Sequence, residues 1–149
     1  MNFLKEVLGH LGPLAGRNLI ALIFVFSGFE KIIGFEATVG YIAAKGLPLA
    51  QWAALGAIVV ELGGGIMLMV GWRARSAAAA LFVFTALAAV IFHAFWAAPA
   101  NQAGNQTIHF LKNVSIMGGL LYVMACGSGS LSLDGEKKQA SNRISHFDL

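Results

Sequence analysis

The order of apolar and polar positions divides the chain into four long apolar segments joined by short polar connections. Each segment holds about twenty residues, the length at which an α-helix crosses about 30 Å of hydrocarbon. The pattern therefore predicts four membrane-spanning helices, at about residues 14–35, 50–71, 76–97 and 108–126. Charged residues interrupt three of these segments, so an arrangement of three spans with a re-entrant first segment stays open as an alternative.

The polar stretches at the two ends set the domain organisation. Residues 1–13 precede the first span, residues 14–126 form the bundle, and residues 127–149 form a polar tail on the cytoplasmic side. Two interpretations of residues 1–13 stay open: a short helix that lies in the membrane interface, or a frayed lead-in. We expect residues 134–149 to be disordered, because they are too few and too polar to form a core.

The composition excludes several classes of protein to which this chain could belong. Hydrophobic residues make up 58% of the chain and charged residues 11%, whereas soluble proteins carry about 25% charged residues. Such a chain is neither disordered nor a soluble domain, because its few polar residues cannot cover its apolar ones. Basic residues do not cluster with aromatic ones, so nothing supports nucleic-acid binding. The lone cysteine, Cys126, excludes an internal disulfide, a CxxC redox pair and a cysteine-based zinc site.

The distribution of basic residues predicts the orientation of the four spans. With a cytoplasmic N-terminus, the cytoplasmic side carries seven basic residues and the opposite side two, with Lys112 just inside the membrane. The seven are Lys5, Arg17, Arg73, Arg75, Lys137, Lys138 and Arg143, and the two are Lys31 and Lys45. The predicted fold is an all-α integral membrane four-helix bundle with both termini in the cytoplasm, surrounded by the lipid bilayer.

Polar residues inside the predicted spans are the candidates for a functional site. A charge at the middle of a bilayer costs about 2.5–3.5 kcal/mol on insertion scales, so such a residue usually has a partner or a role. Glu61 lies near the middle of the second span. With alternating helix directions, five more residues fall in the outer half of the membrane: Glu30, Lys31, His93, His109 and Lys112. All four spans thus contribute polar groups to one region of the bundle.

Helical spacing predicts that these groups point into the bundle. Glu61 shares a helix face with Gly64, Gly65 and Leu68. Small residues on that face let a neighbouring helix approach closely, so the charged face is also the face that packs. The corresponding faces are Ser27, Gly28 and Lys31 on the first span, and Lys112, Ser115 and Gly119 on the fourth.

Two interpretations of Glu61 stay open. It forms an ion pair with Lys31 or Lys112 that only fixes the register of the helices, or it takes part in proton transfer or ligand binding. Glu30 and Lys31 are similarly ambiguous, because long charged side chains near a membrane interface extend to water.

The histidines also have a structural interpretation. His93 lies in the run FHAFW at residues 92–96 and fits an aromatic belt at the membrane interface. No further ligands stand at metal-binding spacing beside His93 and His109, so we predict no metal site.

The order and spacing of several motifs resemble the DoxX family of small bacterial four-helix membrane proteins. The resemblance covers about residues 14–134. It rests on Arg17 and SGFEK at 27–31, ELGGG at 61–65, GWR at 71–73, FHAFW at 92–96, FLKN at 110–113, GG at 118–119 and GSGSLSLD at 127–134. The resemblance implies a four-helix bundle in the bacterial inner membrane. Some members of this family are linked to thiosulfate:quinone oxidoreduction, and others to membrane complexes that handle oxidative or thiol stress.

The resemblance thereby implies a membrane subunit in quinone- or thiol/sulfur-linked redox chemistry, and the depth of the polar residues predicts a polar pocket in the outer leaflet. Quinone would be the cofactor, and a partner redox subunit would complete the reaction, because the chain lacks paired cysteines. In this hypothesis Glu61 and His93 transfer protons near neutral pH. The candidate ligand-binding residues are Lys31, Lys112, Asn113, Glu30 and His109.

Two other functions stay open, so the sequence does not decide whether the chain is an enzyme. The first is a non-catalytic membrane scaffold or assembly partner, in which the polar cluster is structural. The second is a carrier for a small solute; because four spans are few for a transporter, a homo-oligomer would supply the path.

Overall fold

The computed structural model describes residues 2–135, with side chains from residue 9 onward, and this part of the chain contains helices but no strands. Four helices are long and apolar enough to cross a membrane, as predicted: Gly9–Ile33, Ala50–Val70, Ala74–Ala97 and Ala100–Cys126. In chain order the elements are α1 (Asn2–Ile33), α2 (Phe35–Ala44), α3 (Ala50–Ile58), the π-helical turn η1 (Val59–Gly63), α4 (Gly64–Val70), α5 (Ala74–Phe92), the 3-10 turn η2 (Phe95–Ala97) and α6 (Ala100–Cys126).

Two helices extend beyond the predicted spans. The lead-in is continuous with the first span, so α1 runs over 32 residues with Pro13 inside it. The fourth helix begins at Ala100 instead of about residue 108. The stretch after Pro99 is polar but contains no second proline, and a helix can start directly after a proline and continue through polar residues.

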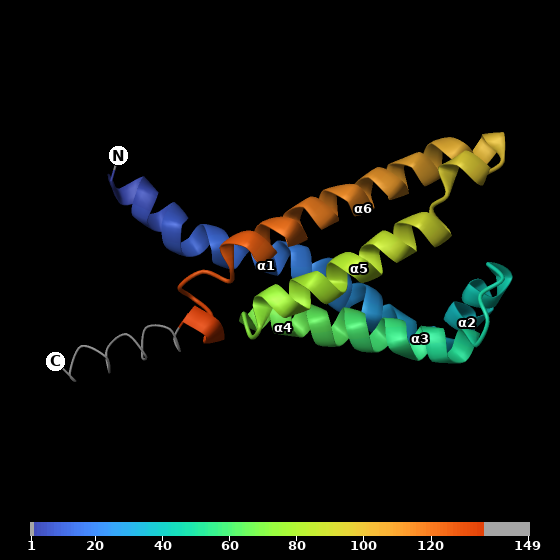
Figure 1. Cartoon of the computed structure of the whole chain (residues 1–149), viewed down its shortest axis with the longest axis horizontal. Coiled ribbons are helices and arrows are strands. Elements are labelled where there is room, and N and C mark those ends of the chain that lie inside the picture. The colour runs from blue at the N-terminus through green and yellow to red at the C-terminus, as the bar shows by residue number, and fades with distance from the viewer. Residues whose placement is uncertain (1, 136–149) are drawn as a thin grey trace.

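The short helix α2 was not predicted. It follows a break at Gly34 and ends at Ala44, and Gly46, two residues later, adopts a positive φ of 76°. Glycine tolerates this left-handed conformation, and Pro48, two residues later, cannot continue a helix. With ten residues α2 is too short to span a bilayer. It lies beside α3 at the end of the bundle opposite to the N-terminus (Figure 1).

The helices pack tightly at one end of the bundle and diverge at the other. The start of α1 and the segment that follows α6 lie at the same end (Figure 1). At the opposite end, the α2–α3 connection lies far from the α5–α6 connection. The buried core joins α1, α4, α5 and α6, and consists of Ala21, Phe24, Leu68, Ala74, Ala78, Leu81, Leu120 and Val123. Many other large apolar side chains are exposed, which suits helices whose outer surface contacts lipid.

The glycine-bearing face of the second span packs as predicted. Glu61, Gly64, Gly65 and Leu68 are all buried. A Cβ atom on Gly65 would lie 2.9 Å from Cγ2 of Val25, closer than normal packing allows. The absence of that atom lets α1 and α4 approach each other.

The predicted inward face of the fourth span is wrong for Lys112 and Ser115, which are exposed, whereas Gly119 packs closely against Ile20 of α1. The side of α6 that faces the bundle carries Ile116, Leu120 and Val123 instead. The share of buried residues is lowest in α6 among the four spans. A narrow apolar stripe is enough for such a helix, and Lys112 stands one turn before Ile116, toward the end of the bundle where the helices diverge (Figure 1).

After α6 the chain folds back across the end of the bundle. The Arg17 side chain is 3% exposed and donates hydrogen bonds to the backbone carbonyls of Met69, Ser128 and Leu131. The Asp134 carboxylate accepts hydrogen bonds from the backbone N–H groups that begin α5, each at 3.0 Å. Asp134 is therefore held in place, contrary to the expected disorder; residues 136–149 of the predicted tail lie outside the described part.

Candidate functional site

Glu61 lies in the π-helical turn η1, between α3 and α4. Its side chain is buried, with 4% of the residue exposed. Two β-branched residues, Val59 and Val60, precede it and three glycines follow, a combination that disfavours regular α-helix. A π-turn places one extra residue in the helix, and such turns recur at functional sites. Here the turn presents a carboxylate toward α1.

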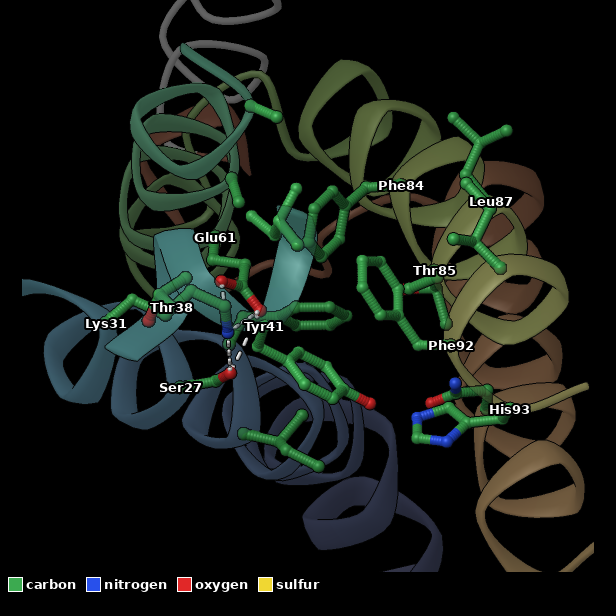
Figure 2. A pocket seen from close by; sticks show the side chains of 18 of the residues that line it. Ser27, Lys31, Thr38, Tyr41, Glu61, Phe84, Thr85, Leu87, Phe92 and His93 are labelled. Carbon is green, nitrogen blue, oxygen red and sulfur yellow. Dashed lines mark hydrogen bonds and ion pairs between the residues drawn. The ribbon is translucent and has the colours of Figure 1, made fainter. Parts of the chain in front are cut away.

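The partner of Glu61 is Lys31, one of the two lysines that the sequence left open. Lys31 Nζ lies 2.9 Å from Oε2 of Glu61 and 3.1 Å from Oε1. Ser27, one helical turn before Lys31 on α1, donates a hydrogen bond of 3.0 Å to Oε1 and accepts one of 2.7 Å from Nζ. Figure 2 shows the three side chains in contact. We call Ser27, Lys31 and Glu61 the polar triad.

One oxygen of the polar triad has unused hydrogen-bonding capacity. Oε2 of Glu61 is buried, and no donor in the described part of the chain forms a hydrogen bond to it. Its contact with Lys31 Nζ is close, but the contact is an ion pair without hydrogen-bond geometry. Buried carboxylate oxygens normally accept hydrogen bonds, so this atom is an available acceptor.

The polar triad borders a cavity of about 420 Å³ between α1, α2, α3, α5 and α6. This volume lies within the usual range for small-molecule pockets, about 300–1,000 Å³. Most of the lining is apolar, and the rings of Tyr41 and Phe92 stack with their centroids 5.3 Å apart. His93 and Asn113 line the cavity at a distance from the triad, and Figure 2 shows His93 across the cavity from Lys31 and Glu61. The cavity thus has apolar walls and separate polar groups.

The structure brings four of the seven predicted site residues to this cavity: Lys31, Glu61, His93 and Asn113. His109 does not line the cavity but stacks on His93, with ring centroids 5.0 Å apart. Glu30 and Lys112 are exposed and do not line it.

A second contact fixes the His93 ring. Its Nδ1 lies 3.0 Å from the side-chain oxygen of Gln106, on the first turns of α6. Within residues 2–135 no group of three or more His, Cys, Asp and Glu side chains is placed to hold a metal ion.

Sequence reasoning missed the residues that α2 contributes. Thr38, Tyr41 and Ile42 line the cavity, but their stretch was interpreted as a connection between spans. The available signal was their spacing of three and four positions between Gly34 and Gly46, which is typical of one face of a helix.

Comparison with known proteins places the chain among small inner-membrane proteins. The DoxX family model matches residues 12–94. The chain is 38% identical to inner membrane protein YphA of Escherichia coli over 81% of its own length and 86% of YphA. It is 33% identical to inner membrane protein YqjF of the same organism, over 83% and 90% of the two chains. A Surfeit locus protein 4 homolog of Schizosaccharomyces pombe is 30% identical over 84% of this chain, but over 37% of that longer protein. No solved structure gives a significant match.

Proposed function

The chain belongs to the DoxX family of multi-pass inner-membrane proteins, and from this premise we propose that its cavity binds a lipid-soluble ligand of the quinone class. The proposed role is that of a membrane subunit in quinone-linked oxidation of thiols or sulfur compounds. One observation carries the proposal. An apolar cavity within the membrane-spanning helices is bordered by a buried carboxylate and an ammonium group, and Oε2 of the carboxylate receives no hydrogen bond.

The shape and chemistry of the cavity suit a quinone ring. Such a ring is flat and apolar and carries oxygen acceptors at opposite edges. The stacked rings of Tyr41 and Phe92 offer an aromatic surface. Lys31 supplies an ammonium donor at one side of the cavity, and the Asn113 amide supplies a donor elsewhere in the lining.

The polar groups can also hold protons. Reduction of a quinone takes up two electrons and two protons. Glu61 and His93 are the titratable acid and base that line the cavity together with Lys31 and Tyr41. A carboxylate that pairs with an ammonium at the wall of an apolar cavity is placed to exchange a proton with a bound ligand.

The electrons come from a donor outside this chain. Cys126 follows Asn113 by thirteen residues on α6, which places it about 20 Å further along the helix. Two external thiols that are oxidised to one disulfide release two electrons and two protons, which balances the reduction of one quinone. A partner redox subunit would bring this donor to the membrane.

We propose to test ligand binding in lipid nanodiscs with a short-chain ubiquinone analogue. The variant carries both Lys31→Met and Glu61→Gln, because removal of either charge alone would leave the other without its partner inside the membrane-spanning helices. We expect the affinity to fall at least about tenfold, the effect of one lost charge-assisted hydrogen bond. Reduction of the same analogue by thiosulfate or a thiol is measured in the same samples, with and without membrane extract to supply a partner.

The matched control is Glu36→Gln, which removes a negative charge from an exposed position on α2. We expect this variant to bind the analogue as the wild type does. Equal affinity in the wild type and in the double variant, with both proteins folded, would refute a quinone site at the polar triad.

A scaffold function is the second candidate, and one observation favours it. The polar triad joins α1 to η1 at a close helix contact, where a Cβ atom on Gly28 would lie 3.3 Å from Cβ of Glu61. An ion pair at this position can fix the register of two helices without any ligand. Loss of thermal stability in the double variant, together with no analogue binding by the wild type, would support the scaffold.

A further inference from the structure

A second cavity, of about 610 Å³, lies at the end of the bundle that carries the start of α1. It forms where the connection between α4 and α5 meets the segment that follows α6 (Figure 1). A hydrogen bond of 3.0 Å from the backbone N–H of Asp134 to the carbonyl of Gly71 joins the two segments. The lining consists of Arg73, Arg75, Ser76, Asp134, Gly135 and residues 126–130.

The lining is rich in donors for an anion. Arg73 and Arg75 contribute two guanidinium groups, and Asp134 is the one carboxylate among the lining residues. Both oxygens of that carboxylate already accept hydrogen bonds from the backbone N–H groups of Arg73 and Ala74. Arg75 donates to the carbonyl of Ala125 at 3.3 Å, which leaves most of its five N–H donors for another acceptor.

Arg17 orients the backbone of the segment after α6. It binds the carbonyl oxygens of Ser128 and Leu131 from inside the bundle. Because the C=O and N–H groups of a trans peptide point in opposite directions, the N–H of Gly129 points away from Arg17. Within the described residues this N–H has no acceptor. Gly129 itself lines the cavity, and its amide is the backbone donor that we assign to a ligand there.

The cavity also lies at the ends of the membrane-spanning helices, the level at which a bilayer places its headgroups. The second span ends at Val70, the third begins at Ala74 and the fourth ends at Cys126, so the cavity stands at the ends of three spans. Large apolar side chains beside it are exposed, with Trp72 at 45% and Leu131 at 47%. Basic pockets between spans, flanked by apolar and aromatic residues, fit a phosphate group with acyl chains alongside.

We propose that this cavity binds the phosphate headgroup of an anionic phospholipid. The phosphate lies between Arg73 and Arg75 and accepts a hydrogen bond from the backbone N–H of Gly129. The acyl chains run along the exposed apolar surface of the spans. This site is separate from the polar triad and does not depend on the function proposed for it.

The test is retention of lipid by the purified full-length chain, measured by native mass spectrometry from micelles that contain equal phosphatidylglycerol and phosphatidylcholine. We expect the wild type to retain phosphatidylglycerol. The variant with Arg73→Gln and Arg75→Gln should bind it about thirtyfold more weakly, which corresponds to about 1 kcal/mol for each arginine. A charge-matched control with Lys45→Gln and Lys112→Gln removes two positive charges away from the cavity and should retain the lipid.

A second measurement keeps the proposal testable if the arginine variant folds poorly. The wild type should unfold at a higher temperature in phosphatidylglycerol nanodiscs than in phosphatidylcholine nanodiscs, and 1 M salt should remove most of the difference, with a screening length of about 3 Å. Equal lipid retention by the arginine variant and the wild type would overturn the proposal, as would an equal loss in the control. Stabilisation by inorganic phosphate without retention of phosphatidylglycerol would overturn it too, in favour of a free anion.

Discussion

Arg17 and Glu61 are both buried charges inside membrane-spanning helices, and their charges are compensated in different ways. Glu61 meets an ammonium group and a hydroxyl. Arg17 meets three backbone carbonyls. Carbonyl oxygens carry only partial negative charge, but a planar guanidinium with five donors can satisfy several of them at once. Each of the three guanidinium nitrogens of Arg17 donates to one carbonyl, and two of these hydrogen bonds hold the segment after α6.

We predict that Arg17→Met destabilises the protein by about 3 kcal/mol. The change removes hydrogen bonds from a charged donor and leaves the carbonyls of Met69, Ser128 and Leu131 without that donor. Thermal unfolding in detergent measures the loss, and limited proteolysis shows whether cleavage after Cys126 becomes faster.

The control is Arg17→Lys, which keeps the charge but offers a single ammonium group. It should be intermediate in stability, because one ammonium cannot reach all three carbonyls. An Arg17→Met variant as stable as the wild type would show that these hydrogen bonds do not hold the segment after α6 in place.

At the scale of the helices, close packing of α1 against η1 and α4 places the polar triad. Gly28 on α1 and Gly65 on α4 lie so close to the opposing helix that a side chain at either position would not fit. The approach brings Lys31 within reach of Glu61. Glycine lowers helix propensity by about 1 kcal/mol relative to alanine, so its presence here reflects the contact and not the helix.

A pair of glycine substitutions separates the contact from helix propensity. A Cβ atom on Gly28 would lie 2.7 Å from Cγ of Leu62 and 3.1 Å from its backbone nitrogen, whereas one on Gly56 of α3 meets nothing within 4 Å. We expect Gly28→Ala to lower the free energy of unfolding by about 2 kcal/mol relative to Gly56→Ala. Both variants gain the same helix propensity, so thermal unfolding of the pair isolates the packing effect. Equal stability of the two variants would show that α1 and η1 are not in close contact.

At the scale of the whole molecule, the two ends of the bundle differ. One end is closed by the core, by Arg17 and by the segment after α6. At the other end the connections α2–α3 and α5–α6 lie far apart (Figure 1), and α2, α3 and α5 contribute lining residues to the cavity beside the polar triad. Which end faces the cytoplasm remains a prediction from the distribution of basic residues, which places the closed end inside.

The single cysteine allows a direct test of that orientation. Cys126 is exposed at the closed end, where α6 finishes. A membrane-impermeant maleimide should label it in inverted membrane vesicles but not in right-side-out vesicles. The reciprocal variant, with Cys126→Ser and Ala97→Cys, moves the thiol to an exposed position at the opposite end and should show the reverse pattern. Labelling of wild-type Cys126 in right-side-out vesicles would place both termini outside.

The sequence by itself determined the four spans, the burial of Glu61 and the packing face around Gly64 and Gly65. These features are local, because the bilayer sets the length of each span and penalises an unpaired charge wherever it occurs. The tertiary structure alone decided that Glu61 pairs with Lys31 and not with Lys112. That choice depends on contacts between helices far apart in the chain, because α1 packs closely against η1 at Gly28 whereas Lys112 on α6 stays exposed.

The same limit explains the parts that sequence reasoning missed. Tyr41 reaches the cavity only because α2 folds back beside α3. Arg17 meets Ser128 across 111 positions of sequence. Spacing within one helix predicts which residues share a face, but it carries no information on which distant segment will cover that face. That information comes from tertiary packing, in which the side chains of all the helices must fit together at once.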